Sequence, residues 1–204
     1  MRKICYIIGV IFVVLLSFWF FKPSGIDPVE ETPTVATPDL TKLPQAYRSD
    51  LYKFGINLPQ GFAIDENHKY ESTPMKTFSG VRFNIPKSLH EGTNLSSDSY
   101  MSIEYAPGAI NSCSAQIFLD SSELKGFADV NGHRYTVAYY LGAGAGNRYD
   151  ETVFATPVDG GCIAVRYFIH YGVYENYPVG TIKKFDEEGL KSLFDSIRQS
   201  LVLN

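Results

Sequence analysis

Residues 141–151, LGAGAGNRYDE, combine three alternating glycines with a polar cluster, a composition that occurs in phosphate-binding loops. A dinucleotide-binding fingerprint needs GxGxxG between a strand and a helix, and a P-loop needs a Gly-Lys-Ser/Thr end. Here the third glycine, Gly146, is followed by Asn147, and residues 148–157 have a strand pattern. No helix N-terminus is then available to hold a phosphate, so the stretch predicts a hairpin connection or a glycine-rich strand end.

The polar cluster that follows the glycines is a candidate interaction site. Arg148, Tyr149, Asp150 and Glu151 lie beside a predicted flexible loop, where binding residues are often found. The alternative is that these residues form only the solvated end of a hairpin.

A second candidate interaction site lies in residues 170–190, HYGVYENYPVGTIKKFDEEGL, which connect a predicted strand to the last helix. Exposed tyrosines bind partners well because they are large, stiff and amphipathic. We therefore count His170, Tyr174, Asn176 and Tyr177 among the candidate interaction residues. The alternative is that the tyrosines only cover the junction between strand and helix.

No catalytic, metal or cofactor motif stands out in the sequence. Neither HExxH nor GxSxG occurs, and we predict no catalytic residue, no cofactor and no bound metal. One triplet, Asn94-Leu95-Ser96, matches an N-glycosylation acceptor, although such triplets are common. The four histidines have neither the i,i+4 spacing of a helical site nor the i,i+2 spacing of a strand site: His68, His90, His133 and His170.

Composition limits the class of protein. The 204 residues suffice for one domain and an appendage, and a hydrophobic share of 45% can build a core. Fourteen tyrosines and fourteen phenylalanines favour strands over a helical bundle. The net charge is −4 without a block of basic residues, so we predict no nucleic acid partner.

The N-terminal residues 1–22 predict a transmembrane anchor. Arg2 and Lys3 precede an uncharged run, residues 4–21, which as a helix rises roughly 27 Å, close to the ~30 Å hydrocarbon core of a bilayer. The run ends in four bulky aromatic residues instead of the small residues that a signal peptidase needs. An uncleaved anchor in the inner (cytoplasmic) membrane is therefore favoured over a cleaved signal peptide. The positive-inside rule then places the rest of the chain in the periplasm or outside the cell.

The cysteines fit this topology. Cys5 falls at the membrane segment, whereas Cys113 and Cys162 both belong to the predicted outer domain. An even pair in an oxidising compartment predicts a disulfide, and the alternative is two buried free thiols.

Residues 23–46 predict a spacer between the anchor and the domain. The segment holds five prolines and four acidic residues and has little to bury, which is typical of an extended linker. A proline-rich ligand for another domain is the alternative, but no basic residue flanks a PxxP core.

Residues 47–204 predict an α+β domain that is mainly antiparallel β-sheet packed by a C-terminal helix. Asn131-Gly132 predicts a tight hairpin turn. Alternation in residues 99–107 predicts that Met101, Ile103 and Tyr105 face the core, and residues 62–78 fit a loop or a helix. Strands are predicted in 52–62, 81–88, 99–107, 114–120, 148–157 and 162–172, and a helix is predicted by Asp186 as N-cap and the spacing of Leu190, Leu193, Phe194, Ile197 and Leu201.

Three stretches carry a resemblance to a known family: GAGAGNRYDE, the cysteine-started CIAVRYFIHY, and NYPVGTIKKFD before the last helix. Over residues 135–200 the chain resembles an uncharacterised family of bacterial extracytoplasmic proteins, membrane-anchored or secreted. This resemblance implies a location outside the cytoplasm and brings no known activity. In layout, YKFGINLPQGF and the closing helix are similar to the PsbP/MOG1-like fold, in which helices pack against a central antiparallel sheet.

Two functional hypotheses follow from the sequence. The first is a membrane-tethered binding or interaction module of the bacterial cell envelope, in contact with the bilayer through residues 4–21 and with an envelope protein or a small ligand. The second is an envelope hydrolase whose site is assembled from distant residues. A deep pocket with convergent acidic, basic and nucleophilic groups would favour the hydrolase.

Overall fold

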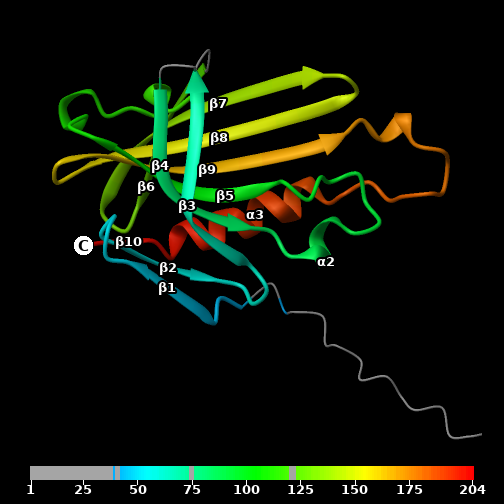
Figure 1. The fold of residues 1–204 in the computed structure, drawn as a ribbon, viewed down its shortest axis with the longest axis horizontal. Helices are drawn as coiled ribbons and strands as arrows, with labels where there is room; N and C mark the ends of the chain where they lie inside the picture. The colour runs from blue at the N-terminus through cyan, green and yellow to red at the C-terminus, as the bar shows by residue number, and fades with distance from the viewer. Residues whose placement is uncertain (1–38, 40–41, 74–75, 120–122) are drawn as a thin grey trace, which may run out of the picture. The chain divides into compact units, whose positions relative to one another are not determined.

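Antiparallel strands joined by tight turns make up most of the domain (Figure 1). The computed structural model describes residues 39, 42–73, 76–119 and 123–204, which belong to one unit, Thr37–Asn204. The strands are β1 (Gln45–Ser49), β2 (Phe54–Leu58), β3 (Ala63–Thr73), β4 (Lys76–Asn84), β5 (Tyr100–Pro107), β6 (Glu123–Val130), β7 (His133–Gly144), β8 (Asn147–Val158), β9 (Gly161–Gly172) and β10 (Val202–Leu203). The helices are α2 (Lys87–His90) and α3 (Glu187–Gln199), with 3-10 turns η1 (Ile110–Ser112), η2 (Ala115–Ile117) and η3 (Tyr174–Asn176).

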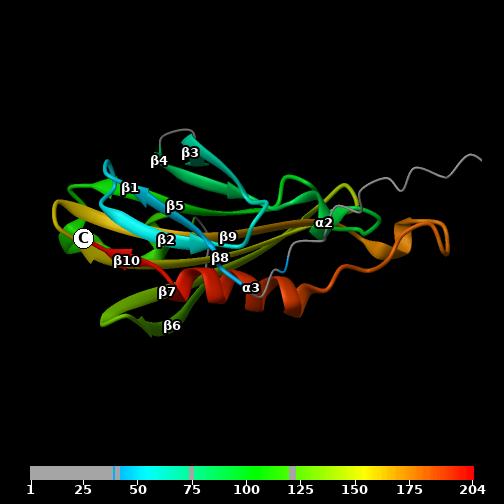
Figure 2. The same cartoon turned by 90° about the horizontal axis from the view of Figure 1, so that it is seen from below.

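The strands form two sheets. A seven-stranded sheet has the order β3-β4-β5-β9-β8-β7-β6, and a three-stranded sheet has the order β1-β2-β10, with antiparallel pairing throughout. Figure 2 shows α3 running beside the small sheet, and α3 contacts β2 directly. The coarse prediction of a mainly antiparallel β-sheet with a C-terminal helix is therefore confirmed.

The two faces of the large sheet are covered differently. On one face, which we call the helix face, apolar side chains of β4, β5, β8 and β9 pack with those of α3 and β2 in the main core. On the opposite face, which we call the loop face, a smaller cluster forms where residues 108–119 lie over small side chains such as Ala106, Ala155 and Ala164. Both faces of the central strands are consequently buried.

Residues with positive φ close the hairpins. Asn131 and Gly132 (φ 49° and 80°) join β6 to β7, as predicted. Ala145 and Gly146 (φ 49° and 80°) join β7 to β8 in the same way, because such two-residue turns need positive φ at both positions. The other two glycines of the opening stretch lie within β7. The stretch is thus a glycine-rich strand end closed by a tight turn and followed by a strand.

Strand β5 shows why alternation alone understated the core. Met101 and Ile103 lie in the main core, as predicted, and Tyr105 is half-buried. The loop 108–119 and strand β3 cover the other side of the strand. The opposite set is therefore buried as well: Tyr100, Ser102 and Glu104.

Helix α3 forms where its spacing predicted it. Asp186 is the N-cap, and its side chain accepts a hydrogen bond from the backbone N–H of Gly189 (2.9 Å). Glu187 and Glu188 in the first turn complement the positive end of the helix dipole. The apolar residues at helical spacing, Leu190, Leu193, Phe194 and Ile197, are all buried against the helix face.

One prediction of local structure was wrong, and for one region the sequence did not decide between loop and helix. Residues 114–120 were predicted as a strand, but Ala115–Ile117 form the 3-10 turn η2, because the Ser114 hydroxyl accepts from the Gln116 N–H and competes with strand pairing. Residues 62–78, which fitted a loop or a helix, contain the long edge strand β3. Its outward residues are charged or polar, as is common on edge strands, and this conceals the alternation.

The predicted transmembrane segment, residues 4–21, and most of the predicted linker 23–46 lie outside the residues that the structure describes. In residues 39, 42–73, 76–119 and 123–204, no helix is both long and apolar enough to cross a membrane. Strand β1 begins at Gln45, so the last two residues of the predicted linker, 45 and 46, belong to the domain.

The predicted disulfide is present between Cys113 and Cys162, with an S–S distance of 1.99 Å. It joins the loop that contains η1 and η2 to the start of β9, across a sequence separation of 49 residues. The bond therefore fixes the loop that covers the loop face.

Reduction of this disulfide should destabilise the domain. Closing a loop of this length lowers the entropy of the unfolded chain by an amount worth about 4 kcal/mol. We expect the midpoint of urea unfolding, followed by circular dichroism, to fall when a reductant is added. A Cys113→Ser/Cys162→Ala variant should start at the lower midpoint and not respond to reductant. Equal midpoints with and without reductant would contradict a stabilising role.

Candidate functional site

Strand β8 divides the polar cluster that the sequence singled out. Because side chains alternate along a strand, Arg148 and Asp150 point to the helix face, whereas Tyr149 and Glu151 point to the loop face. The four residues are neighbours in sequence but do not form one surface. Only half of the predicted cluster is available to either face.

Asp150 joins the sheet to helix α3. It is 2% exposed, and its Oδ2 accepts from Lys191 Nζ (2.7 Å) and, more weakly, from the Tyr139 hydroxyl (3.4 Å). Lys191 Nζ also donates to Glu187 Oε1 (2.7 Å). Arg148 lies opposite Tyr171 in the sheet and donates to the carbonyl of Asn147. Asp150 therefore anchors the first turns of α3.

On the loop face, Glu151 belongs to a buried ionic network centred on Arg166. The Arg166 guanidinium donates from Nε and Nη2 to the two oxygens of Glu104 (2.8 and 3.0 Å) and from Nη1 to Glu151 Oε2 (2.5 Å). Nη2 also donates to the carbonyl of Phe118 (2.7 Å), and the guanidinium lies over the ring of Tyr70, 3.4 Å from its centroid. Arg166 and Glu104 are both 0% exposed.

The electrostatics of this network favour the ionised form. Burial alone would raise the pKa of Glu104, but the charge of Arg166 outweighs burial and lowers that pKa to about 2. His68, also buried, places Nε2 3.7 Å from Glu104 Oε1 without a hydrogen-bond partner. With its donors engaged and no solvent contact, Arg166 holds the carboxylates in place and does not present them to a substrate.

His170 and Tyr149 form a separate group on the loop face. The Nδ1 atom of His170 lies 2.8 Å from Asp98 Oδ1, and its ring stacks on Tyr149 with centroids 4.5 Å apart. Burial alone would raise the pKa of Asp98, but hydrogen bonds from Ser96 and His170 outweigh it and lower that pKa. The Nε2 atom of His170 is buried and lacks a hydrogen-bond partner. An Asp–His pair can orient a general base, but here the base nitrogen does not reach solvent.

The remaining candidates lie after β9. Tyr174 and Asn176 belong to η3, and these two residues and Tyr177 are all exposed. Tyr177 also lines a polar hollow of about 410 Å³ together with Asn147 and residues 91–97. The structure therefore brings Tyr177 close to the tip of the β7–β8 hairpin, which the sequence had treated as a separate site.

Asn94 holds the wall of this polar hollow in place. It is 4% exposed, its Nδ2 donates to the carbonyl of Gly172 (2.7 Å), and its Oδ1 accepts from the N–H of Phe185 (2.9 Å). Its backbone also pairs with Lys183 and Gly172. The asparagine of the glycosylation triplet is thus a buried connector between three segments.

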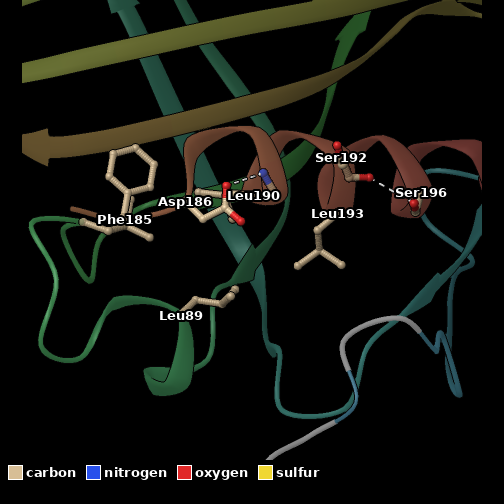
Figure 3. Close-up of a pocket in the computed structure, with 9 residues that line it drawn as sticks. Leu89, Phe185, Asp186, Leu190, Ser192, Leu193 and Ser196 are labelled. Carbon is tan, nitrogen blue, oxygen red and sulfur yellow. Dashed lines mark hydrogen bonds between the residues drawn. The ribbon is translucent and has the colours of Figure 1, made fainter. Parts of the chain in front are cut away.

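An apolar groove runs beside α3 (Figure 3). Its volume is about 360 Å³, and its lining is mainly apolar. Figure 3 shows Leu89 and Leu193 pointing into the space between helix and loop, with Asp186 at one end and the hydroxyl of Ser196 donating to the carbonyl of Ser192 at the rim. The groove is lined by Leu89, Leu95, Phe185, Asp186, Gly189, Leu190, Ser192, Leu193 and Ser196.

Sequence reasoning missed both the groove and the ionic network. The groove lies between α3 and residues 89–95, and nothing in either segment alone signals that they meet. The network had one signal, because Arg166 stands in the middle of the largely apolar strand β9, where a buried arginine needs carboxylate partners. Among the residues that the structure describes, no group of three or more His, Cys, Asp or Glu is placed to hold a metal ion.

Comparisons with known proteins do not identify this chain. No family model matches it, and no curated protein matches it. The chain is similar to one solved structure, a crystal structure of a protein from Bacteroides thetaiotaomicron VPI-5482, with 12% identity and a TM-score of 0.44. The match covers 80% of this chain and 49% of that chain, so this chain spans about half the length of that protein. The resemblances to an extracytoplasmic family and to the PsbP/MOG1-like fold stay predictions.

Replacing Arg166 should destabilise the protein, because Glu104 and Glu151 then lose their cationic partner. The Arg166→Met variant leaves two acidic groups buried without a cation, which should cost about 3–5 kcal/mol of unfolding free energy at pH 7. In the native protein the ion pair stabilises the fold above pH 4.5, the ordinary pKa of glutamate, and the contribution is lost as pH falls toward 2. In the variant, burial of Glu104 is no longer offset by the arginine and raises the pKa of that carboxyl, so the deficit should shrink between pH 7 and pH 4.

Urea unfolding at both pH values measures this difference. The matched control is Arg134→Met, which removes an exposed guanidinium that lies over Phe127 and should change stability by less than about 0.5 kcal/mol. A deficit that is equal at pH 7 and pH 4 would show that lost packing, and not charge, dominates.

Removing the Asn94 side chain should loosen the polar hollow. Asn94→Ala leaves the Gly172 carbonyl and the Phe185 N–H without these partners, and we expect a loss of about 2–4 kcal/mol in unfolding free energy. Asn67→Ala, at an exposed position of β3, is the matched control and should be nearly neutral. Thermal unfolding compares the two variants, and similar midpoints would contradict the connector role.

Proposed function

We propose that this chain is a membrane-tethered extracytoplasmic binding module of the bacterial cell envelope, and that the apolar groove beside α3 is its binding site. The groove carries this proposal. Its floor is made by apolar side chains from two separate segments, Leu193 from α3 and Leu89 and Leu95 from residues 89–95. Small-molecule sites are typically preformed, mostly apolar hollows of about 300–1,000 Å³, and this groove is at the lower end of that range.

The size and chemistry of the groove limit its ligand. A volume of about 360 Å³ accepts a small apolar molecule or a few apolar side chains of a protein partner. The Ser192 hydroxyl and the Asp186 carboxylate at the margin provide polar contacts that would orient it. Binding is favoured over hydrolysis because the buried ionic network lies away from this groove, and the one carboxylate that lines the groove, Asp186, accepts a hydrogen bond from Gly189 N–H as the helix cap.

Two further observations support an extracytoplasmic location. Disulfides persist in oxidising compartments, and Cys113–Cys162 is such a bond. The apolar run 4–21 supplies a tether by its length and its flanking charges. A tethered domain with a preformed groove would hold its ligand near the membrane surface.

Site-specific photocrosslinking in intact cells tests the groove. In the full chain, p-benzoylphenylalanine at Ser196, exposed on the groove rim, should give a defined adduct on irradiation. The same group at Ser79, exposed on β4 away from the groove, is the control and should give none. Adding Ser192→Trp should fill the groove and reduce the adduct at least about tenfold, equivalent to ~1.4 kcal/mol of binding.

The result distinguishes the groove from the rest of the surface. Adducts of similar yield from both positions, or an adduct that Ser192→Trp does not reduce, would contradict specific binding at the groove. Identification of the captured molecule by mass spectrometry would then define the ligand class.

A further inference from the structure

A protruding loop between β9 and α3 gathers exposed apolar side chains. Ten large hydrophobic side chains are exposed in the part of the chain that the structure describes, and three of them fall within six residues. These are Tyr174 (37% exposed), Tyr177 (40%) and Val179 (104%). Single exposed apolar residues are common, but a cluster on one loop indicates a contact surface.

The apolar tip of this loop is held outward by a turn. Gly180 has positive φ (81°), and the N–H and hydroxyl of Thr181 both donate to the carbonyl of Pro178 (3.1 and 2.8 Å). Val179 stands at the apex of this turn, and its side chain is fully exposed. Folding does not require an apolar residue there, because the turn depends on proline, glycine and threonine.

The base of the loop is preorganised on the neighbouring hairpin. Val173 N–H donates to the carbonyl of Gly146 (2.8 Å), and the Tyr174 hydroxyl donates to the carbonyl of Ile182 (3.3 Å). The Lys183 backbone pairs with residues 92–94. The exposed side chains are therefore presented by a fixed backbone, which reduces the entropy lost on contact.

The part of this loop that holds the exposed apolar side chains, residues 174–184, is positively charged on an acidic protein, although the whole connection 173–186 is neutral because it includes Asp186. Residues 174–184 contain two lysines, Lys183 and Lys184, and one acid, Glu175, for a net charge of +1 against −4 for the whole chain. Both lysines are exposed, and within the described residues neither side chain forms an ion pair. Tyrosines and a valine beside unpaired lysines match the interfacial zone of an anionic bilayer, where aromatic rings sit among headgroups and lysines meet phosphates.

We propose that residues 174–184 form a lipid-contact loop that rests on the surface of an anionic bilayer. Val179 enters the boundary between headgroups and acyl chains, Tyr174 and Tyr177 lie at headgroup level, and the two lysines bind lipid phosphates. This inference rests on the membrane tether of the proposed function, and it fixes which end of the domain faces the membrane.

Because the domain is tethered to the membrane, even a weak contact between the loop and the bilayer is sufficient to keep the loop bound. Each lysine near an anionic surface contributes about 1 kcal/mol, so the loop alone binds a membrane weakly. A tether converts this binding into an intramolecular event with an effective concentration of about millimolar. The residues of the predicted linker that precede β1, 23–44, can span at most roughly 75 Å, which is enough to bring any face of the domain to the bilayer.

Depth-dependent fluorescence quenching tests the contact in the full chain. Trp19 is the one tryptophan of the sequence, and Trp19→Phe removes its signal while keeping an apolar aromatic residue. In that background, Val179→Trp places a reporter at the loop tip. In vesicles of phosphatidylglycerol and brominated phosphatidylcholine, we expect this reporter to be quenched at least about twofold more than in unbrominated vesicles.

The matched reporter is Leu51→Trp in the same background. Leu51 is 77% exposed in the β1–β2 connection, at the opposite end of the domain from the loop (Figure 1). It should show little quenching. Lys183→Gln/Lys184→Gln, or 1 M salt, which shortens the screening length to about 3 Å, should reduce quenching at the loop tip.

The outcomes separate the loop from the tether. Full-length protein that resists alkaline extraction from the vesicles, with equal quenching of both reporters, would overturn the lipid-contact loop while leaving the tether intact, and a protein partner would then be the better occupant. Protein that alkaline extraction releases from the vesicles would instead count against the tether. Quenching at the loop tip that salt and the lysine substitutions leave unchanged would overturn the role of lipid phosphates.

Discussion

The buried ion pair between Arg166 and Glu104 is the constraint on which the centre of the domain depends. Both side chains lie on the middle strands of the seven-stranded sheet and have no solvent contact. Taking these charges out of water costs several kcal/mol per ion, and only good geometry with further hydrogen bonds offsets that cost. Glu151 and the carbonyl of Phe118 supply those hydrogen bonds. The strands and the covering loop must therefore be correctly placed together.

This requirement explains the arrangement of the loop face. The segment 108–119 has no long helix or strand of its own, yet it covers the network and provides one of its acceptors. The disulfide fixes this segment to β9, the strand that carries Arg166. A covalent bond to the neighbouring strand limits opening of the loop, and opening would expose the ions to water. The carboxylates of this face thus have a structural role, and the groove that we propose as the binding site lies beside α3 on the helix face.

Periodicity predicted the elements whose two faces differ in polarity. Helix α3, its cap at Asp186 and the turn at Asn131 followed from local patterns, because each depends on residues close in sequence. Strand β3 and the partner of Arg166 did not follow, since a charged edge strand lacks alternation and Glu104 lies 62 residues from the arginine. The groove was equally hidden, because it exists only where α3 meets residues 89–95. Patterns within a single sequence carry no information on contacts between segments that are distant along the chain.

The burial of Asn94 has a consequence for producing the protein in a eukaryotic secretory pathway. Glycosyltransferases modify the nascent chain, and the triplet Asn94-Leu95-Ser96 meets them before Gly172, 78 residues later, has been synthesised. A sugar attached to Nδ2 at that stage would occupy the position that the Gly172 carbonyl needs. In such a host, glycosylated Asn94 could not form its buried hydrogen bond, and the domain would not fold correctly. The Ser96→Ala substitution would remove the acceptor triplet and leave the Asn94 side chain unmodified.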